Sequence, residues 1–396
     1  MNDPLLELRG EFPILGRTTY LVSNSLGAMP GTVPERLAEY VDQWAELGVR
    51  AWANGWWEMP VSVGDEIAPL IGAGRGEIAM LPNVTIAQTA VLSAVPYTAT
   101  RDTIVMTELD FPSVRYAFDG LATRLGARIV VVPSEDGISI DTQRLIDAID
   151  ERTALVAISH VLFRSAYIVD VEAICTKARA VGARVSLDAF HSVGVLPVDV
   201  HWLGVDFLSG GVLKWLCGGP GGAFLYVSEE ASRTLAPSFT GWQAHEHPFA
   251  FDAEMHYAQH AWRWLNGTPP IPALFAATEG PKLVRRAGVD RIREKSIRQT
   301  TRLIELADAN GYRVSAPRDA ARRGGTVAFD VPHAYGVAQS LLANNVIVDY
   351  RPNAGIRVAP HFYTSDDELE RAVSMIGDIL REEAWKPFED KRGVVT

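Results

Sequence analysis

The chain has 396 residues, of which 47% are hydrophobic and 21% charged, a composition typical of an ordinary globular protein with a large buried core. Its formal net charge of −11 opposes non-specific binding to nucleic acids or anionic membranes. No apolar run is long enough to span a bilayer and no signal-like segment opens the sequence, so we expect a cytoplasmic protein without a nucleic-acid or membrane partner. Two cysteines, Cys175 and Cys217, are too few for a disulfide framework or a zinc site.

The first 54 residues form the first predicted unit. The loop "NSLGAMP" at 24–30 is followed by an amphipathic helix pattern at 33–48. We expect this N-terminal segment, 1–54, to pack with the C-terminal domain.

Residues 55–265 are predicted to form one large α/β domain. Short β-branched runs alternate here with amphipathic helix patterns such as 141–152 and 170–182, the second ending at Gly182 in the manner of a helix C-cap. This alternation is typical of a mostly parallel sheet with helices on both faces. The predicted strands are 103–108, 128–133, 154–161, 184–190, 205–211 and 222–227.

Residues 266–396 lack the regular alternation of strands and helices and are predicted to form a smaller α+β domain. A long helical region at 273–310 precedes three strands, at 326–331, 345–351 and 356–360. A final helix is expected at about 365–383.

A lysine between two glycine runs is the strongest chemical signal. Lys214 lies in "GGVLKWLCGGPGG" at 210–222, directly after a predicted strand, and Asp188 closes the preceding one with His191 three residues later. A lone Asp at a strand end is more often a helix cap, but neighbouring parallel strands deliver their carboxyl ends to one crevice. An amine and a carboxylate would therefore meet there.

Val84 and Thr85 begin a predicted helix after "LPN". A helix N-terminus offers free N–H groups and a positive dipole end to an anion. A lysine, an acid and a phosphate-binding helix start are together what pyridoxal phosphate requires.

The segment at 185–227 resembles the cofactor segment of the kynureninase-like branch of the class V aminotransferase superfamily, which are pyridoxal phosphate enzymes of fold type I. The likeness covers most of the chain. The N-terminal loop "YLVSNSLGAMP", the loop "TELDFPSVRY", the Gly241–Trp242 pair, the loop "NGTPPIPAL" and the strand "AGIRVAPHFY" match in the same order.

The resemblance implies a role for each matching residue. Lys214 would bind the cofactor as an imine and move the substrate's α-proton, and Asp188 would pair with the ring nitrogen. The cofactor would further be held by Val84, Thr85, Phe111, which stacks on its ring, Ser159, His191, and, from the neighbouring subunit of a homodimer, Trp242 and Thr268. Asn24, Ser25 and Arg357 would bind the substrate, with Arg357 taking its α-carboxylate; an arginine in a half-buried strand can alternatively serve a structural ion pair.

Two departures bear on the reaction. Where kynureninases have a tyrosine before the lysine this chain has Leu213, and Val114 replaces the acid of their Phe-Pro-Ser-Asp loop. No cysteine follows Cys217, which argues against the persulfide chemistry of the related cysteine desulfurases.

The resemblance therefore implies an enzyme acting on an L-amino acid through an external aldimine and a quinonoid. We favour a lyase or hydrolase that cleaves a C–S or C–C bond at the β or γ carbon. An aminotransferase or epimerase is the alternative, and a catalytically silent relative is the least favoured.

Two further motifs are left open. The tryptophans at 52, 56, 57, 262 and 264 favour either subunit packing or an aromatic lining for the substrate. His245 and His247 have metal-like spacing but no third ligand nearby, so we expect no metal.

Overall fold

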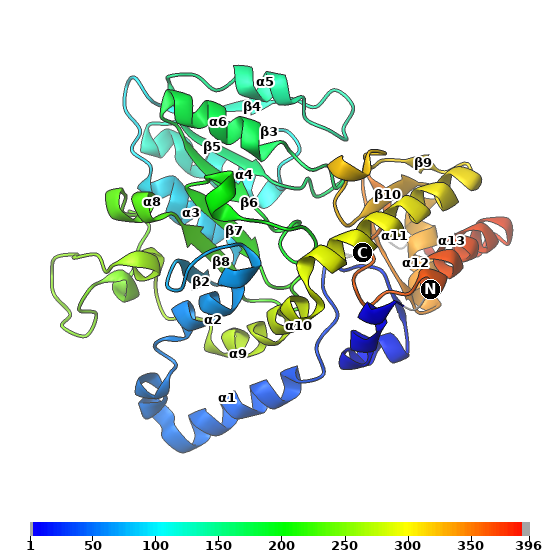
Figure 1. Cartoon of the computed structure of the whole chain (residues 1–396), viewed down its shortest axis with the longest axis horizontal. Helices are drawn as coiled ribbons and strands as arrows, with labels where there is room; N and C mark the ends of the chain where they lie inside the picture. Colours follow the sequence, from blue (N-terminus) through cyan, green and yellow to red (C-terminus); the bar gives the residue numbers. More distant parts are fainter. Residues whose placement is uncertain (1–2, 390–396) are drawn as a thin grey trace.

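The computed structural model describes residues 3–389 and divides into a large and a small sheet, each covered by helices (Figure 1). The large sheet has seven strands in the order β2-β8-β7-β6-β5-β3-β4. Its members are β2 (Ile78–Leu81), β3 (Thr103–Thr107), β4 (Arg128–Val132), β5 (Thr153–Ser159), β6 (Arg184–Asp188), β7 (Phe207–Gly211) and β8 (Ala223–Val227).

Strands β4, β3, β5, β6 and β7 are parallel, whereas β8 pairs antiparallel with both β7 and β2. The predicted, mostly parallel α/β sheet is thus confirmed. Strand β2 was not among the predicted strands, because only five residues separate Gly76 before it from Pro82 after it.

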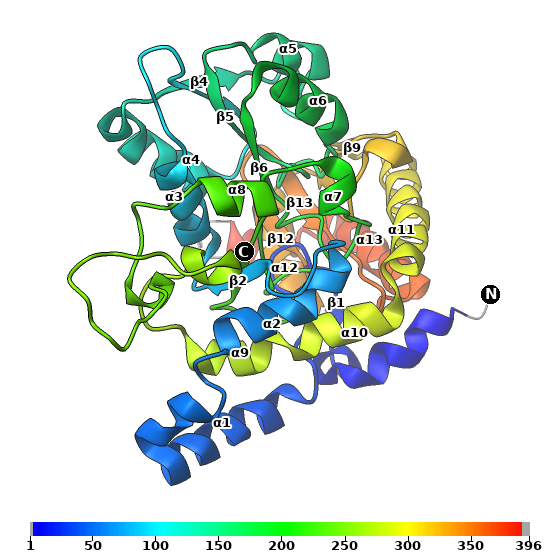
Figure 2. The ribbon, with the colours of Figure 1, turned by 60° about the vertical axis from the view of Figure 1, so that its left-hand side comes forward.

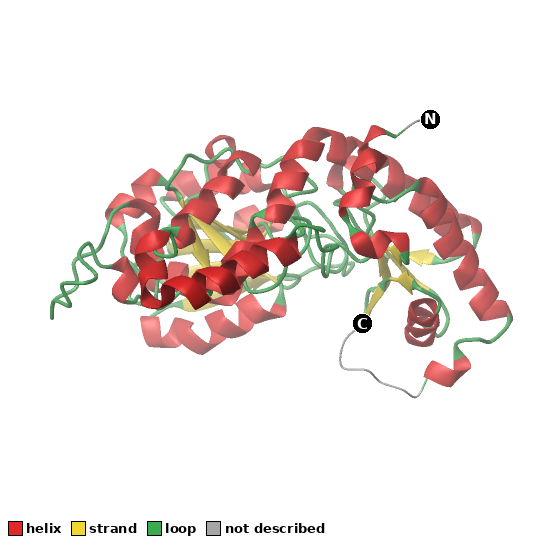
Figure 3. Cartoon of the chain, turned by 90° about the horizontal axis from the view of Figure 1, so that it is seen from below, coloured by secondary structure: helices red, strands yellow, loops and turns green. Residues whose placement is uncertain are grey.

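Helices lie on both faces of the large sheet (Figure 3). Successive strand residues alternate between two buried clusters: Val105 faces one, whereas Ile104 and Met106 face the other. This two-sided burial explains why the strands read as continuous apolar runs. The helices of this part are α2 (Met59–Ile67), α3 (Val84–Ala94), α4 (Pro112–Leu121), α5 (Thr142–Asp147), α6 (Val171–Val181), α7 (Val200–Leu203) and α8 (Glu229–Thr234).

Helix ends follow the expected local chemistry. Asp170 caps α6 by accepting a hydrogen bond from the Ala173 N–H, and Gly182 ends it with a φ of 72°, a conformation that glycine adopts without strain. The C-cap predicted at Gly182 is confirmed.

The small sheet has the order β12-β13-β10-β9. Its strands are β9 (Arg313–Val314), β10 (Val327–Asp330), β12 (Asp349–Arg351) and β13 (Gly355–Val358). The predicted strand at 345–351 divides between two sheets, because its first half, β11 (Val346–Ile347), pairs in parallel with β1 (Thr19–Tyr20).

The predicted helical region at 273–310 consists of three helices, because Thr278 and Gly288, the latter with a φ of 82°, interrupt it. The closing helix begins with a Ser365–Glu368 capping box. The helices are α9 (Ile271–Ala277), α10 (Glu279–Ala287), α11 (Val289–Ala309), α12 (Ala334–Ala343) and α13 (Asp366–Arg381).

The N-terminal segment touches both parts of the molecule. Strand β1 joins the small part through β11, and Arg9 forms an ion pair with Glu368 of α13. Helix α1 (Val33–Leu47) instead packs against α9 and lies apart from the two sheets (Figure 2). In residues 3–389 no helix is both long and apolar enough to cross a membrane.

Candidate active site

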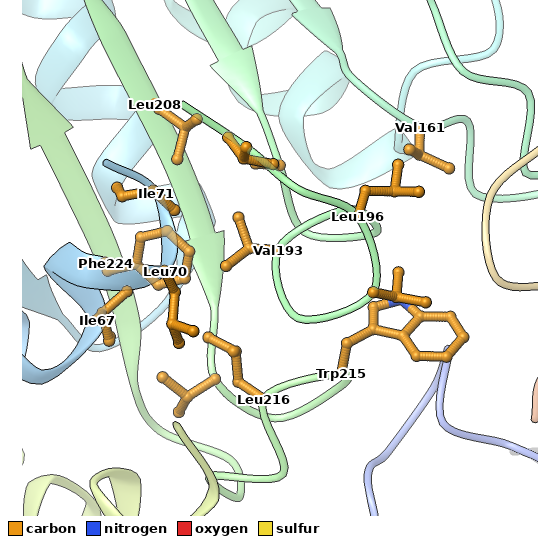
Figure 4. Close-up of a cluster of buried hydrophobic side chains, with 14 of the residues drawn as sticks. Ile67, Leu70, Ile71, Val161, Val193, Leu196, Leu208, Trp215, Leu216 and Phe224 are labelled. Atoms are coloured by element: carbon orange, nitrogen blue, oxygen red, sulfur yellow. The ribbon is translucent and has the colours of Figure 1, made fainter. Parts of the chain in front are cut away.

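Lys214 follows β7 on a loop that the core holds in place. The next two residues, Trp215 and Leu216, are almost completely buried, and Figure 4 shows them within the apolar cluster around Val193 and Leu196. On the other side, the Gly27 N–H donates to the Leu213 carbonyl at 2.8 Å. A Cβ at Gly27 would lie 2.2 Å from the Lys214 carbonyl, so only glycine permits this approach.

The amine of Lys214 lies among aromatic and imidazole groups. Its Nζ is 2.7 Å from His191 Nε2 and 4.3 Å from the centre of the Phe190 ring. Desolvation lowers the pKa of Lys214 to about 7, although the negative charge of Asp188 acts in the opposite direction. A substantial share of the lysine is therefore the neutral, nucleophilic amine at neutral pH.

His191 is buried, and its pKa is well below the ordinary value because of desolvation and the nearby Lys214 and Arg357. The neutral ring can accept a hydrogen bond from Lys214 at Nε2.

Asp188, the last residue of β6, lies in register with Ser159, the last residue of β5, and with Ser209 in the middle of β7. Its Oδ1 accepts a hydrogen bond from the Phe190 N–H at 2.9 Å. Burial raises the pKa of Asp188 to about 6, against the opposing effects of that hydrogen bond and of Lys214. Its other carboxylate oxygen accepts no hydrogen bond from the described residues, which leaves it available to a cationic donor.

The N-terminus of α3 forms the anion-binding side. Asn83 caps the helix by accepting from the Ile86 N–H, and the Thr85 Oγ1 lies 3.0 Å from the Ser113 Oγ. The helix is fixed to the sheet because Gln88 donates to the Ser209 Oγ at 2.7 Å. Two hydroxyls and free N–H groups at a positive dipole end suit a phosphate.

These groups enclose a cavity of about 230 Å³. The structure gathers there seven residues that the sequence analysis selected: Val84, Thr85, Phe111, Ser159, Asp188, His191 and Lys214. Leu213 and Val114, the two departures from kynureninases, also line it. Phe111 leaves 42% of its surface exposed, an unusual amount for a large apolar ring unless another group covers it.

Trp242 and Thr268 do not line this cavity. Thr268 borders a separate cavity of about 170 Å³, and Trp242 packs against Trp57, with ring centres 5.1 Å apart. Within one chain the structure therefore does not bring them to Lys214.

The predicted substrate residues lie around the cavity rather than in its lining. Asn24 is buried, and both polar atoms of its side chain lack a partner among the described residues. Ser25, half-buried, follows it in the loop that reaches Leu213 through Gly27.

Arg357 is buried and forms the structural ion pair that the sequence analysis held as the alternative. Its partner is Asp349, and it also donates to the Phe163 carbonyl at 2.6 Å. Phe163 lines the cavity, so Arg357 lies behind its wall.

Asp110, which precedes Phe111, was not among the predicted site residues. Its two carboxylate oxygens accept hydrogen bonds from the Thr107 and Ser159 N–H groups, each at 2.7 Å. It thereby ties the Phe111 loop to the end of β5. The available signal was an acid beside "FPS", directly after an apolar strand.

A larger cleft, of about 460 Å³, lies at the amino ends of β6 and β7. Among its charged residues, Arg184 and Asp206 are paired with each other, and Arg184 also pairs with Glu230. It offers no comparable set of free reactive groups, so we place the chemistry at Lys214.

The donor set around Lys214 fits pyridoxal phosphate. An amine of lowered pKa can bond to the aldehyde, the unshared oxygen of Asp188 suits a protonated ring nitrogen, and the exposed face of Phe111 suits a planar ring. Thr85, Ser113 and the start of α3 suit the phosphate.

Comparisons with known proteins agree with this geometry. The family model "Aminotransferase class-V" matches residues 19–363. Kynureninase from Burkholderia pseudomallei (strain 1106a) is 32% identical over 98% of this chain and 95% of its own length. Kynureninase from Pseudomonas fluorescens is 33% identical over 97% of this chain and 94% of its own.

Solved structures share the fold. The apo cysteine desulfurase from Thermococcus onnurineus NA1 superposes with a TM-score of 0.84 at 24% identity, covering 96% of this chain and 99% of the other. A cystine C–S lyase in complex with cysteine persulfide gives a TM-score of 0.83 at 21% identity, covering 93% and 99%.

The resemblance seen in the sequence is confirmed, and so are the fold and the cofactor. The chain belongs to the class V aminotransferase family, as a kynureninase-like, pyridoxal phosphate-dependent lyase or hydrolase that acts on an amino acid.

Proposed function

We propose that Lys214 carries the cofactor and then moves the α-proton of an L-amino acid whose β or γ substituent is expelled. The observation that carries this proposal is the amine of Lys214, with a pKa of about 7, 2.7 Å from a neutral His191 and in the same cavity as Asp188. A base with a pKa near the working pH is the most effective proton carrier.

Each residue of the site has a proposed task. When bound, pyridoxal phosphate withdraws electrons from the substrate's α-carbon. Asp188 holds a proton on the ring nitrogen, Phe111 covers one ring face, and His191 accepts a hydrogen bond that orients the Lys214 amine. Thr85 and Ser113 hold the phosphate.

The substrate's α-carboxylate is proposed to bind Arg357. Asn24 supplies a second polar contact, since its buried amide has donor and acceptor atoms without partners among the described residues. Anchoring the carboxylate fixes which bond to the α-carbon is broken.

The apolar Leu213 and Val114 favour substrates with a good leaving group. A phenol in place of Leu213 and an acid in place of Val114 would supply protons near the departing fragment; this chain supplies none from these positions. We therefore propose that kynurenine is a poor substrate and that amino acids with a readily expelled substituent, such as a thiol or halide at the β carbon, react well. Transamination and epimerisation need the same residues and are not favoured.

We further propose a homodimer in which Trp242 and Thr268 complete the partner's site. Both lie outside the Lys214 cavity of their own chain, and Phe249 and Phe251 beside Trp242 are exposed. Exposed aromatic rings at this density are typical of a subunit interface. The cytoplasmic location remains a prediction.

Steady-state kinetics on L-kynurenine, L-cysteine and β-chloro-L-alanine test the reaction. We expect pyruvate and ammonia from β-chloro-L-alanine and a far lower kcat/KM for kynurenine. Pyridoxamine phosphate as the main product in the absence of a keto acid would instead establish transamination. A kcat/KM for kynurenine of about 10⁴ M⁻¹s⁻¹ or more would refute the argument from Leu213.

A further inference from the structure

A completely buried acid lies opposite Arg357 in the small sheet. Asp349 of β12 pairs in register with Arg357 of β13 and has no exposed surface. Its Oδ1 accepts from the Arg357 Nε at 2.8 Å, and its Oδ2 accepts from Nη2. We propose that Asp349 is a positioning residue that fixes the Arg357 guanidinium for the substrate's α-carboxylate; this rests on the role proposed for Arg357.

The hydrogen bonds of Arg357 leave room for one carboxylate. A guanidinium has five N–H bonds. Asp349 takes one from Nε and one from Nη2, and the Phe163 carbonyl takes one from Nη1. The two that remain lie one on each Nη, and charge-assisted bonds of this kind are the ones a carboxylate forms with an arginine.

The third bond locates this pair beside the site. Phe163 is 194 residues from Arg357 in the chain and belongs to the loop after β5. Phe163 lines the Lys214 cavity, and its ring centre lies 5.2 Å from that of Phe111. Arg357 therefore links the small sheet to the wall of the cavity, and its two hydrogen bonds to Asp349 set the orientation of its guanidinium there.

Asp349 has two opposed effects on a bound carboxylate. Its negative charge weakens the attraction of Arg357 for another anion. Its bidentate contact, however, prevents the long arginine side chain from turning toward other acceptors. A second arginine, Arg351, also contacts the Asp349 Oδ2, at 3.3 Å. Two arginines therefore share one carboxylate, and the three side chains together keep a net positive charge. We infer that orientation outweighs repulsion, because a buried arginine without its acid would move to find other partners.

Binding of an amino acid and of its decarboxylated analogue separates these effects. The holoenzyme is titrated with L-alanine and with ethylamine, and the cofactor absorbance reports each Kd. The ratio of the two Kd values measures the contribution of the carboxylate alone. In Asp349→Asn we expect the preference for L-alanine to fall by about tenfold to a hundredfold, with ethylamine binding unchanged. A general loss of structure would instead weaken the binding of both L-alanine and ethylamine.

The matched control is Asp330→Asn, which removes an exposed ion pair with Arg313 from the same sheet and should leave the ratio unchanged. If Asp349→Asn does not fold, Asp349→Glu, which keeps the charge but shifts it by one methylene, serves for the same comparison and should also lower the ratio.

An unchanged or increased preference in the folded Asp349 variant would overturn the inference. The variant Arg357→Lys distinguishes failure of the inference about Asp349 from failure of the proposed role of Arg357. If Arg357→Lys lowers the ratio and the Asp349 variant does not, only the inference fails. If Arg357→Lys leaves the ratio unchanged, the carboxylate role of Arg357 fails, and the inference with it.

Discussion

The Lys214 cavity and the aromatic surface around Trp242 are built in different ways. In the cavity, Ser159 and Asp188 come from adjacent strand ends held in register, and Asp110 and Gln88 tie the surrounding loops to the sheet. On the aromatic surface, Trp57 contacts Trp242 and Phe249, which belong to one long connection after α8, and Phe249 remains 61% exposed. The sheet thus defines the first region within one chain, whereas the second gains its function, in our proposal, only against a partner.

The largest effect on activity is expected at Lys214, because the chemistry proposed for the cavity depends on this one side chain. Lys214→Ala should lower kcat by on the order of 10²–10⁴, because it removes the proposed proton carrier, and the neighbouring His191 has a pKa well below its ordinary value and is the weaker base. Steady-state assays on β-chloro-L-alanine measure it, with Lys177→Ala on α6 as the control. Activity within a few-fold of wild type would mean that another group moves the proton.

A smaller effect is expected on the aromatic surface. Trp242→Ala and Thr268→Ala should each weaken retention of the cofactor by about tenfold, the cost of a lost contact to a phosphate, while leaving kcat of the saturated enzyme nearly unchanged. Dialysis followed by absorbance reports this loss. Trp202→Ala, which removes another exposed tryptophan, on α7, is the control. If these variants retain the cofactor like wild type, the two regions are independent and the shared site is wrong.

The pH dependence of cofactor capture tests whether the cavity lowers the pKa of Lys214. The pKa of Lys214 is lowered from 10.5 to about 7 by burial, so the amine is charged below this pH and neutral above it. Only the neutral amine attacks an aldehyde. The rate at which apoenzyme captures pyridoxal phosphate should therefore rise about tenfold from pH 6 to pH 8 and then level off. A stopped-flow rate that continues to climb to pH 10 would indicate an ordinary solvated lysine.

The smallest effect is a gain. Leu213→Tyr introduces a phenol that can donate a proton at the cavity and should raise kcat/KM for kynurenine several-fold. The gain is small because the acid that Val114 replaces is still missing, and one proton donor alone recovers only part of an acid–base effect. Adding Val114→Asp should raise it further. A double variant no better than wild type would show that these two positions do not limit the reaction with kynurenine.

The sequence predicted the parts that follow from periodicity and strand ends. Lys214, Asp188 and Ser159 each lie at or just after an apolar run, and parallel strands bring such positions together. The start of α3 at Val84 and the end of α6 at Gly182 follow from capping chemistry. The resemblance supplied the roles of these residues, which periodicity alone does not provide.

Other features depend on pairing across distance. Strand β9 has two residues, too few for any pattern. Asp349 reads as an ordinary acid in "VDYR", and only the register of β12 against β13 places it on Arg357. The Phe163 contact joins residues 194 apart. Trp242 and Thr268 were expected at a partner's site, and no contact within one chain tests that expectation.

The central claim is that Lys214 holds the cofactor, and reductive trapping tests it most directly. Borohydride reduction of the holoenzyme converts the C=N bond between cofactor and lysine into a stable link, and peptide mass spectrometry locates it. We expect the phosphopyridoxyl mass on Lys214, with none on that peptide in Lys214→Ala. A label on another lysine, or no label on protein saturated with pyridoxal phosphate, would contradict the account.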